Sequence, residues 1–169
     1  TALYLSAIAQ TPMGLRAQDL QELYPQNWDE AEFSYFTAFL DGFLVCNDNG
    51  CYTIPSGLMR HACLQAGEEG LLRKLAVYFA TLPDNDPVKV GSALPMFLIF
   101  GMVQEAATLL LANPRQEALY HQLWNMLLHT RANVSALLNR DDMLDLFLKQ
   151  GITLQEDRVR LTALSEILK

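Results

Sequence analysis

The stretch from Asn27 to Leu64 limits the possible folds most, because it places two helical patterns on either side of a tight turn. Its first part predicts an amphipathic helix, since four apolar residues recur at helical spacing: Phe33, Phe36, Leu40 and Phe43. Asn27 is suited to cap this helix, with Glu30 reaching back as in a capping box. Asn49 and Gly50 then supply the positive backbone dihedrals that a short β-hairpin turn needs. The sequence therefore predicts a helix that leads directly into two short strands.

Further helices are predicted on both sides of this stretch. Two short ones lie before it, over residues 2–9 and 17–24, and are joined by an extended link that begins at Leu15. Another follows the hairpin, where Ser56 is a natural N-cap. A winged-helix domain has this order of elements: short helices, then one more helix, then a two-stranded wing. We therefore expect residues 1–82 to form a winged-helix-like subdomain.

The rest of the chain is helical in pattern. The run from Pro83 to Pro87 is the clearest turn and the expected boundary between two subdomains. A similarity between the segments around Gly101 and Gly151 suggests stacked helical hairpins. Residues 83–169 are therefore expected to form antiparallel helical hairpins, as the start of a helical repeat, in a mainly α fold. The predicted helices are 88–100 (kinked or split at Pro95), 103–112, 116–129, 134–138, 141–149 and 154–168.

The charge balance argues against nucleic acid as a partner. The chain has a net charge of −7 and a pI of about 4.8. Residues 1–66 contain two arginines and no lysine against seven acidic residues. The helix that a winged helix would place in a DNA groove carries only acidic charges, at Asp29, Glu30, Glu32 and Asp41. Because phosphate neutralisation supplies most of the affinity for DNA, we expect no nucleic-acid partner.

Membrane association is also not expected. The most apolar run, residues 93–103, contains Pro95 and Gly101 and is too short and too broken to cross a bilayer. No charged-then-apolar signal segment opens the chain. We therefore expect a cytoplasmic location. The first residue is Thr1 rather than Met, which suggests a piece of a longer protein or a processed one.

Three cysteines cannot all pair within the chain, which favours reduced, intracellular thiols. Two alternatives remain open. If the hairpin closes with a four-residue loop, Cys46 and Cys51 face each other across it and can oxidise. Cys46, Cys51 and Cys63 also form, with His61, a set of soft zinc ligands. This spacing lacks the two-residue knuckle of zinc-binding motifs, so we expect no metal.

Parts of the chain resemble the segment that follows the nucleotide-binding core in STAND-type regulatory ATPases, the relatives of the NACHT and apoptotic ATPases. The similar runs are YTIPSGLMR (Tyr52 to Arg60), LLRKLAVYFATLP and ALPMFLIFGMVQEAATLLL, and the resemblance extends from Ala2 to about Leu128. It implies a winged helix followed by helices that transmit the state of an upstream nucleotide-binding domain to downstream sensor repeats. The expected partner is this upstream nucleotide-binding domain or another protein.

Ser56 departs from that family's pattern. The resemblance implies a histidine at this position, which in several members touches the phosphates of bound ADP in the closed, inactive state. The hydroxyl of Ser56 can donate one hydrogen bond but carries no positive charge, and its simpler role is as a helix cap. The phosphate-binding run Gly-x-x-x-x-Gly-Lys-Ser/Thr does not occur in the sequence, so we expect no nucleotide or other cofactor on this chain.

Catalysis has little support in the sequence. His121 and His129 are eight residues apart on one predicted helix, but no Ser or Cys nucleophile stands at a recognisable elbow. Asp141 and Asp142 open a predicted helix, where carboxylates are favoured by the helix dipole. Trp124 is suited to packing. We therefore expect a protein that is not an enzyme.

The expected function is that of a non-catalytic regulatory and protein-interaction module in a larger signalling protein. The expected contact surface comprises Ser56 to Arg60, the hairpin tip around Asn49, and Trp28, with Ser56 as the candidate nucleotide-sensing position. Arg60 is expected to pair with an acidic residue on the partner or within the subdomain. Two alternatives stay open: a winged-helix scaffold in a multiprotein assembly without nucleotide regulation, and a small acidic enzyme.

Overall fold

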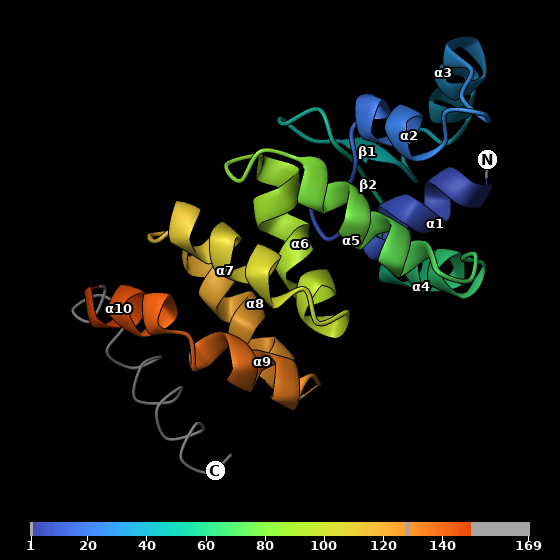
Figure 1. Cartoon of the computed structure of the whole chain (residues 1–169). Coiled ribbons are helices and arrows are strands. Elements are labelled where there is room, and N and C mark those ends of the chain that lie inside the picture. The colour runs from blue at the N-terminus through green and yellow to red at the C-terminus, as the bar shows by residue number, and fades with distance from the viewer. Residues whose placement is uncertain (1, 128, 150–169) are drawn as a thin grey trace. The chain divides into compact units, whose positions relative to one another are not determined.

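The computed structural model describes residues 2–127 and 129–149, which divide into two compact units between Thr81 and Leu82. The described residues contain ten helices and a two-stranded antiparallel sheet (Figure 1), which confirms the predicted mainly helical class with one small hairpin. The first unit contains α1 (Ala2–Gln10), α2 (Ala17–Leu23), α3 (Glu30–Phe39), β1 (Val45–Cys46), β2 (Tyr52–Thr53), α4 (Gly57–Gln65) and α5 (Leu71–Thr81).

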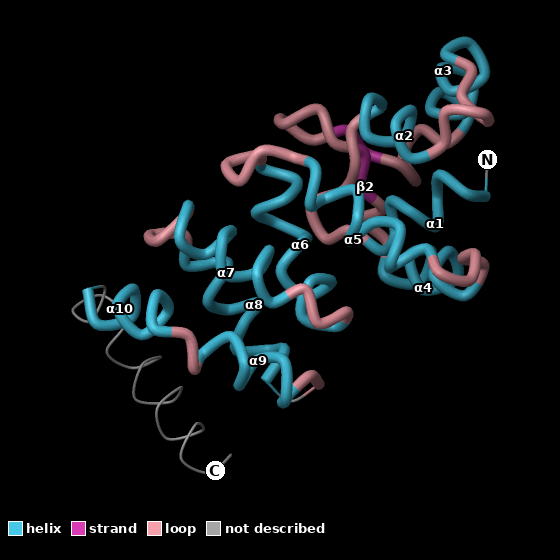
Figure 2. The backbone as a smooth tube through the Cα atoms, viewed as in Figure 1, coloured by secondary structure: helices cyan, strands magenta, loops and turns pink. Residues whose placement is uncertain are grey.

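The sheet of the first unit has a short third member. β1 pairs with β2 with Val45 opposite Thr53, and Leu15 forms an antiparallel bridge with Tyr52 on the other edge of β2. Figure 2 shows the two strands as a small magenta segment among the surrounding helices. Gly14 allows this approach, because its φ is +78° and a Cβ there would lie 2.2 Å from the Tyr52 carbonyl oxygen. The link between α1 and α2 is therefore part of the sheet.

An aromatic cluster fills the space between α1, α3 and the sheet. The Tyr4 ring is its centre, with centroids 5.9 to 6.1 Å from those of four other rings: Tyr24, Trp28, Phe33 and Phe36. Phe33 also meets Tyr52 of β2 edge to face, at 5.3 Å between centroids. Such edge-on pairs add about 0.5–1.5 kcal/mol each beyond the area that they bury.

A buried ionic network joins α2 to α5. Asp19 is fully buried and accepts hydrogen bonds from the Arg16 backbone N–H at 2.7 Å and from the Arg16 guanidinium at 2.8 and 2.9 Å. The Tyr78 hydroxyl of α5 donates to the same carboxylate at 2.6 Å. A buried charge is tolerated only when it is paired and hydrogen-bonded in this way.

The second unit consists of helices that pack in pairs. α6 packs against α7 and α8, while α9 packs against α7 and α8, so two helical hairpins stack on one another. Residues 154–168, where another helix is predicted, lie outside the described residues. The helices of this unit are α6 (Pro87–Ile99), α7 (Val103–Ala112), α8 (Glu117–Leu127), α9 (Arg131–Leu138) and α10 (Asp141–Lys149).

Pro95 lies inside α6 without ending the helix. Proline has no N–H, so the carbonyl of Gly91, four residues earlier, loses its partner within the helix. The side-chain amide of Gln122, on α8, donates to the Val90 and Gly91 carbonyls at 3.2 and 3.4 Å. The neighbouring helix therefore supplies the hydrogen bond that Pro95 removes.

The turn that opens the second unit is fixed by side chains of that unit. Lys89 is buried, and its ammonium lies 2.7 Å from the Asp84 carboxylate and donates to the Leu82 carbonyl at 2.8 Å. Asn113, at the end of α7, donates to the Asp84 carbonyl at 2.7 Å. Asp86 caps α6 by accepting from the Val88 N–H.

Two details of the first unit differ from the sequence prediction. The N-cap of α3 is Asp29, which accepts from the Glu32 N–H at 2.8 Å, so the prediction of Asn27 as the cap was wrong. Phe43 was expected on the apolar face of the helix, but α3 ends at Phe39 and Phe43 is 53% exposed. Gly42, with φ +84°, follows the helix and turns the chain toward β1.

None of the described helices has the length and apolar character needed to span a bilayer.

Candidate functional site

Ser56 lies at the start of α4 as its N-cap. Its hydroxyl accepts a hydrogen bond from the Met59 N–H at 3.4 Å, and its side chain is exposed. Ser56 therefore acts as a helix cap in this structure, which is the simpler of the two roles expected for it. Leu58, in the first turn of the same helix, is 82% exposed, so the start of α4 presents an apolar side chain to solvent.

Arg60 bonds to backbone rather than to a carboxylate within the unit. Its Nε donates to the Ala9 carbonyl at 2.8 Å, where α1 approaches its end. The Ser6 hydroxyl donates in the other direction, to the Cys63 carbonyl of α4 at 3.1 Å. These two bonds fasten α4 to α1, although α4 has no fully buried residue of its own.

Asn49 and Gly50 form the tip of the hairpin. Gly50 adopts φ +72°, but no described residue other than glycine has a positive φ, so Asn49 does not supply the second positive dihedral that was expected. Instead the Asn47 side chain organises the turn, accepting from the N–H groups of Asn49 and Cys51 at 3.0 Å each. Side chains of this type stabilise turns by replacing a backbone acceptor.

The cysteines of the hairpin do not face each other. Cys46 is paired with Tyr52, one residue beyond the partner that a Cys46–Cys51 pair would need. Cys46 is exposed and Cys51 is buried, and neither is joined in a disulfide. The alternative in which Cys46 and Cys51 face each other across a four-residue loop therefore does not apply, because Asn47 and Cys51 close the loop. Burial raises the pKa of the free Cys63 thiol, which makes it less reactive at neutral pH.

Trp28 belongs to the aromatic cluster. Its ring lies 4.8 Å from that of Phe33 and 6.0 Å from that of Tyr4, between centroids, and its side chain is half-buried. Packing of α3 onto α1 explains its position without a partner protein.

The predicted contact residues do not gather at one place. Ser56 and Arg60 share α4, while Asn49 lies in the hairpin loop and Trp28 precedes α3. Within the first unit, the hairpin tip and α4 lie on opposite sides (Figure 1). The start of α4 and the hairpin tip are therefore two separate surfaces.

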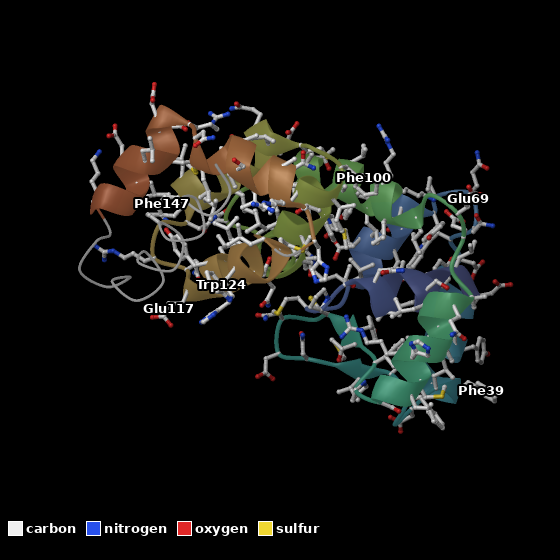
Figure 3. The ribbon with its side chains drawn as sticks, turned by 90° about the horizontal axis from the view of Figure 1, so that it is seen from below. Phe39, Glu69, Phe100, Glu117, Trp124 and Phe147 are labelled. Atoms are coloured by element: carbon white, nitrogen blue, oxygen red, sulfur yellow. The ribbon has the colours of Figure 1, made fainter. Side chains whose placement is uncertain are left out.

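The outer side of α3 was missed in the sequence prediction. Tyr35 and Phe39 are 80% and 86% exposed, on the side of the helix opposite the buried Phe33. In Figure 3, Phe39 lies at the periphery of the ribbon. The signal was present in the sequence, because Tyr35 and Phe39 are four residues apart and thus share a face that excludes Phe33 and Phe36.

The candidate catalytic residues are not assembled into a site. His121 and His129 are both exposed, and His129 lies beyond the last residue of α8. Asp142 is hydrogen-bonded by the Arg140 guanidinium at 2.7 and 2.9 Å, and this bond lowers the pKa of its carboxyl group. Among the described residues, no three His, Cys, Asp or Glu side chains are placed to hold a metal ion.

Comparison with known proteins identifies no relatives: no protein-family model matches the chain, and neither a curated protein nor a solved structure matches it significantly.

Proposed function

We propose that this chain is a non-catalytic regulatory module of a larger, nucleotide-regulated signalling protein, in which its first unit is a winged helix that docks on an upstream nucleotide-binding domain. In the resting state the winged helix packs against that domain, and on activation it swings away as a rigid body. The proposal places no cofactor on this chain and gives it no catalytic residue.

The bridge between Leu15 and Tyr52 is the observation that carries the proposal. With this one-residue bridge included, the first unit runs helix, bridge, helix, helix, strand, strand and then α4 and α5, with Leu15 and β1 on opposite edges of β2. Winged helices have a similar order of elements, which supports the proposal. The predicted resemblance to the regulatory ATPases supplies the partner and the mechanism.

The start of α4 is the docking surface that we propose. Leu58 is exposed there although it contributes nothing to the core, and Ser56 holds the first turn in place as its cap. Arg60 supports this surface indirectly, because its bond to the Ala9 carbonyl positions α4. We therefore assign Arg60 a positioning role and Leu58 the direct contact.

The docking is tested by Leu58→Asp in the full-length protein, with bound ADP and ATP turnover as readouts. A charge at a buried apolar contact should shift the closed–open equilibrium by about tenfold or more, so ADP should be lost and turnover should rise. Leu111→Asp makes the same change at an exposed leucine of α7 and should leave both readouts unchanged. Equal values for Leu58→Asp and the unmutated protein would reject the docking.

The nucleotide-sensing role of Ser56 is tested by two variants that both keep the cap. Ser56→Asn and Ser56→Asp each retain a side-chain oxygen for the Met59 N–H. If the position faces phosphates, the added charge of Ser56→Asp should weaken ADP binding while Ser56→Asn does not. The same affinity for both variants would leave Ser56 as a cap alone.

The alternative is a winged-helix scaffold in a multiprotein assembly without nucleotide regulation. It is favoured if the full-length protein holds no nucleotide and has no phosphate-binding loop. A scaffold should also tolerate Leu58→Asp without any change in turnover.

A further inference from the structure

We propose that the outer face of α3, formed by Ala31, Tyr35, Ala38 and Phe39, binds a basic amphipathic helix of another protein. This surface is separate from the start of α4, and the proposal does not rest on regulation by nucleotide.

α3 is apolar on two opposite sides. Phe33 and Phe36 face inward to the rings of Tyr4 and Tyr52. All four residues of the outer face are exposed to solvent, and Phe39 lies clear of the ribbon (Figure 3). A helix at the surface of a protein normally has a polar outer side, and one that is apolar all round is normally covered. The two aromatic side chains on the outer face therefore mark a contact surface.

The size of the surface suits a helix. α3 has ten residues and is thus about 15 Å long, and its outer side chains at positions 31, 35, 38 and 39 follow helical spacing. A partner helix lying alongside would cover two to three turns, with its own apolar side chains set between Tyr35 and Phe39.

The charge around this face specifies a basic partner. Four acidic residues lie on α3 or next to its ends, and all are exposed: Asp29, Glu30, Glu32 and Asp41. No Lys, Arg or His occurs from residue 17 to residue 59, so this part of the chain offers no opposite charge of its own. A partner with Lys or Arg beside its apolar residues would complement these carboxylates, and arginine can also stack on the two aromatic rings.

The same charge argues against other occupants. In a symmetric dimer formed through this face, a second copy of the chain would bring the same acidic residues to the contact and no base from residues 17–59. An anionic membrane surface would be repelled for the same reason. The complementary occupant is therefore a basic helix.

The test uses the whole chain and a synthetic peptide of about 18 residues, with leucines on one helical face and lysines and arginines on the other. A matched peptide carries glutamate in place of each basic residue. Fluorescence anisotropy of the labelled peptides should show binding of the basic peptide at low salt, weaker binding as salt rises, and no binding of the acidic one.

Variants then locate the site. Tyr35→Ala combined with Phe39→Ala should weaken binding of the basic peptide by at least about tenfold, because aromatic side chains at the centre of an interface contribute most of its energy. Leu58→Ala removes an equally exposed side chain from α4 and should have no effect. Circular dichroism should show the same helix content for all variants, since every substituted side chain is exposed.

Four outcomes would overturn the proposal: equal binding of the acidic peptide, full binding by the Tyr35/Phe39 variant, an equal loss with Leu58→Ala, or no binding of the basic peptide at all. A dimer in sedimentation that disappears in the Tyr35/Phe39 variant would instead assign the face to a second copy of the chain. Binding to phosphatidylserine vesicles that depends on the same two residues would assign it to a membrane.

Discussion

Among single side chains, Asp19 is the most strongly constrained. It is fully buried between α2 and α5, and the Arg16 guanidinium and the Tyr78 hydroxyl together satisfy its oxygens. Arg16 is the residue before α2 and Asp19 is three residues further on, so the pair also closes the first turn of that helix. One carboxylate thus caps a helix and joins it to another.

Tyr78→Phe should change the response of this network to alkaline pH. Burial, followed by the hydrogen bond to Asp19, raises the pKa of Tyr78 above its ordinary value near 10. The folded state then holds the proton more tightly than the unfolded state does. The stability contributed by Tyr78 is therefore complete below about pH 10 and is lost as the pH rises further.

Urea unfolding measured from about pH 7 to pH 11 checks this expectation. Tyr78→Phe should cost about 1 kcal/mol at neutral pH through the lost hydrogen bond, and this difference should shrink above pH 10. Tyr24, whose pKa is raised to about 12 chiefly by burial, should keep part of the alkaline response in both proteins. If the free energy of unfolding depended on pH in the same way for both proteins, the alkaline response would not come from Tyr78.

Among the strands and turns, two glycines with positive φ should differ in the cost of substitution. Gly50→Ala should cost about 1 kcal/mol, because the turn has open space around it and only the backbone is strained. Gly14→Ala adds a Cβ that overlaps the Tyr52 carbonyl and should cost at least about 2–3 kcal/mol.

Thermal or urea unfolding of these two variants gives the comparison. Gly14→Ala should also increase amide exchange at Leu15 and Tyr52, whose N–H groups bond to each other's carbonyls at 3.2 and 2.8 Å. Equal costs at the two positions would show that Leu15 is not held as a member of the sheet.

Among the helices, Gln122 and Pro95 should be coupled. Gln122→Leu leaves the Gly91 carbonyl without a partner and should cost about 1–2 kcal/mol. In a Pro95→Ala background the helix regains its own bond to Gly91, so the same substitution should cost clearly less. A double-mutant cycle measures this difference, and strict additivity would exclude the compensation.

Most helices, and the presence of the hairpin, could be predicted from periodicity and turn residues, while the register of the hairpin and the cap of α3 could not. The bounds of α7 and α10 agree with the prediction. For α7, Gly101 and Asn113 interrupt a clear apolar pattern on either side of the helix. The hairpin loop is closed by Asn47 and Cys51, and the Asn47 side chain stabilises it by accepting from the Cys51 N–H. Cys46 therefore pairs with Tyr52, one residue beyond Cys51. Side-chain acceptors of this kind compete locally and leave no periodic signal.

Only part of the candidate site could be predicted from the sequence. Ser56 could be recognised as a cap from the residues that follow it. The hydrogen bond from Arg60 to the Ala9 carbonyl could not be predicted, because it joins residues that are 51 positions apart in the sequence. The exposure of Tyr35 and Phe39 could not be predicted for a different reason. α3 has two apolar sides, and the sequence does not show which of them packs against the core.

For the chain as a whole, each unit has its own network and its own core, so destabilisation should remain local. Asp19→Asn removes the buried carboxylate of the first unit and should cost about 2–4 kcal/mol there, because the buried ion pair with Arg16 and its charge-assisted hydrogen bonds are lost. Hydrogen exchange followed by mass spectrometry should show faster exchange in peptides from residues 2–81 and little change in those from 82–149. Asp48→Asn, at the exposed hairpin, is the control and should have little effect. Equal acceleration in both sets of peptides would mean that the units unfold together.

The scarcity of basic residues has a practical consequence for labelling. Lys74 is the only lysine among residues 1–81, and its ammonium lies 3.8 Å from the centre of the Tyr24 ring. An amine-reactive fluorophore therefore has one side chain to attach to in this half of the molecule. Trypsin has no cleavage site between Arg16 and Arg60, so the helix with the exposed aromatic residues and the hairpin are released together in one long peptide.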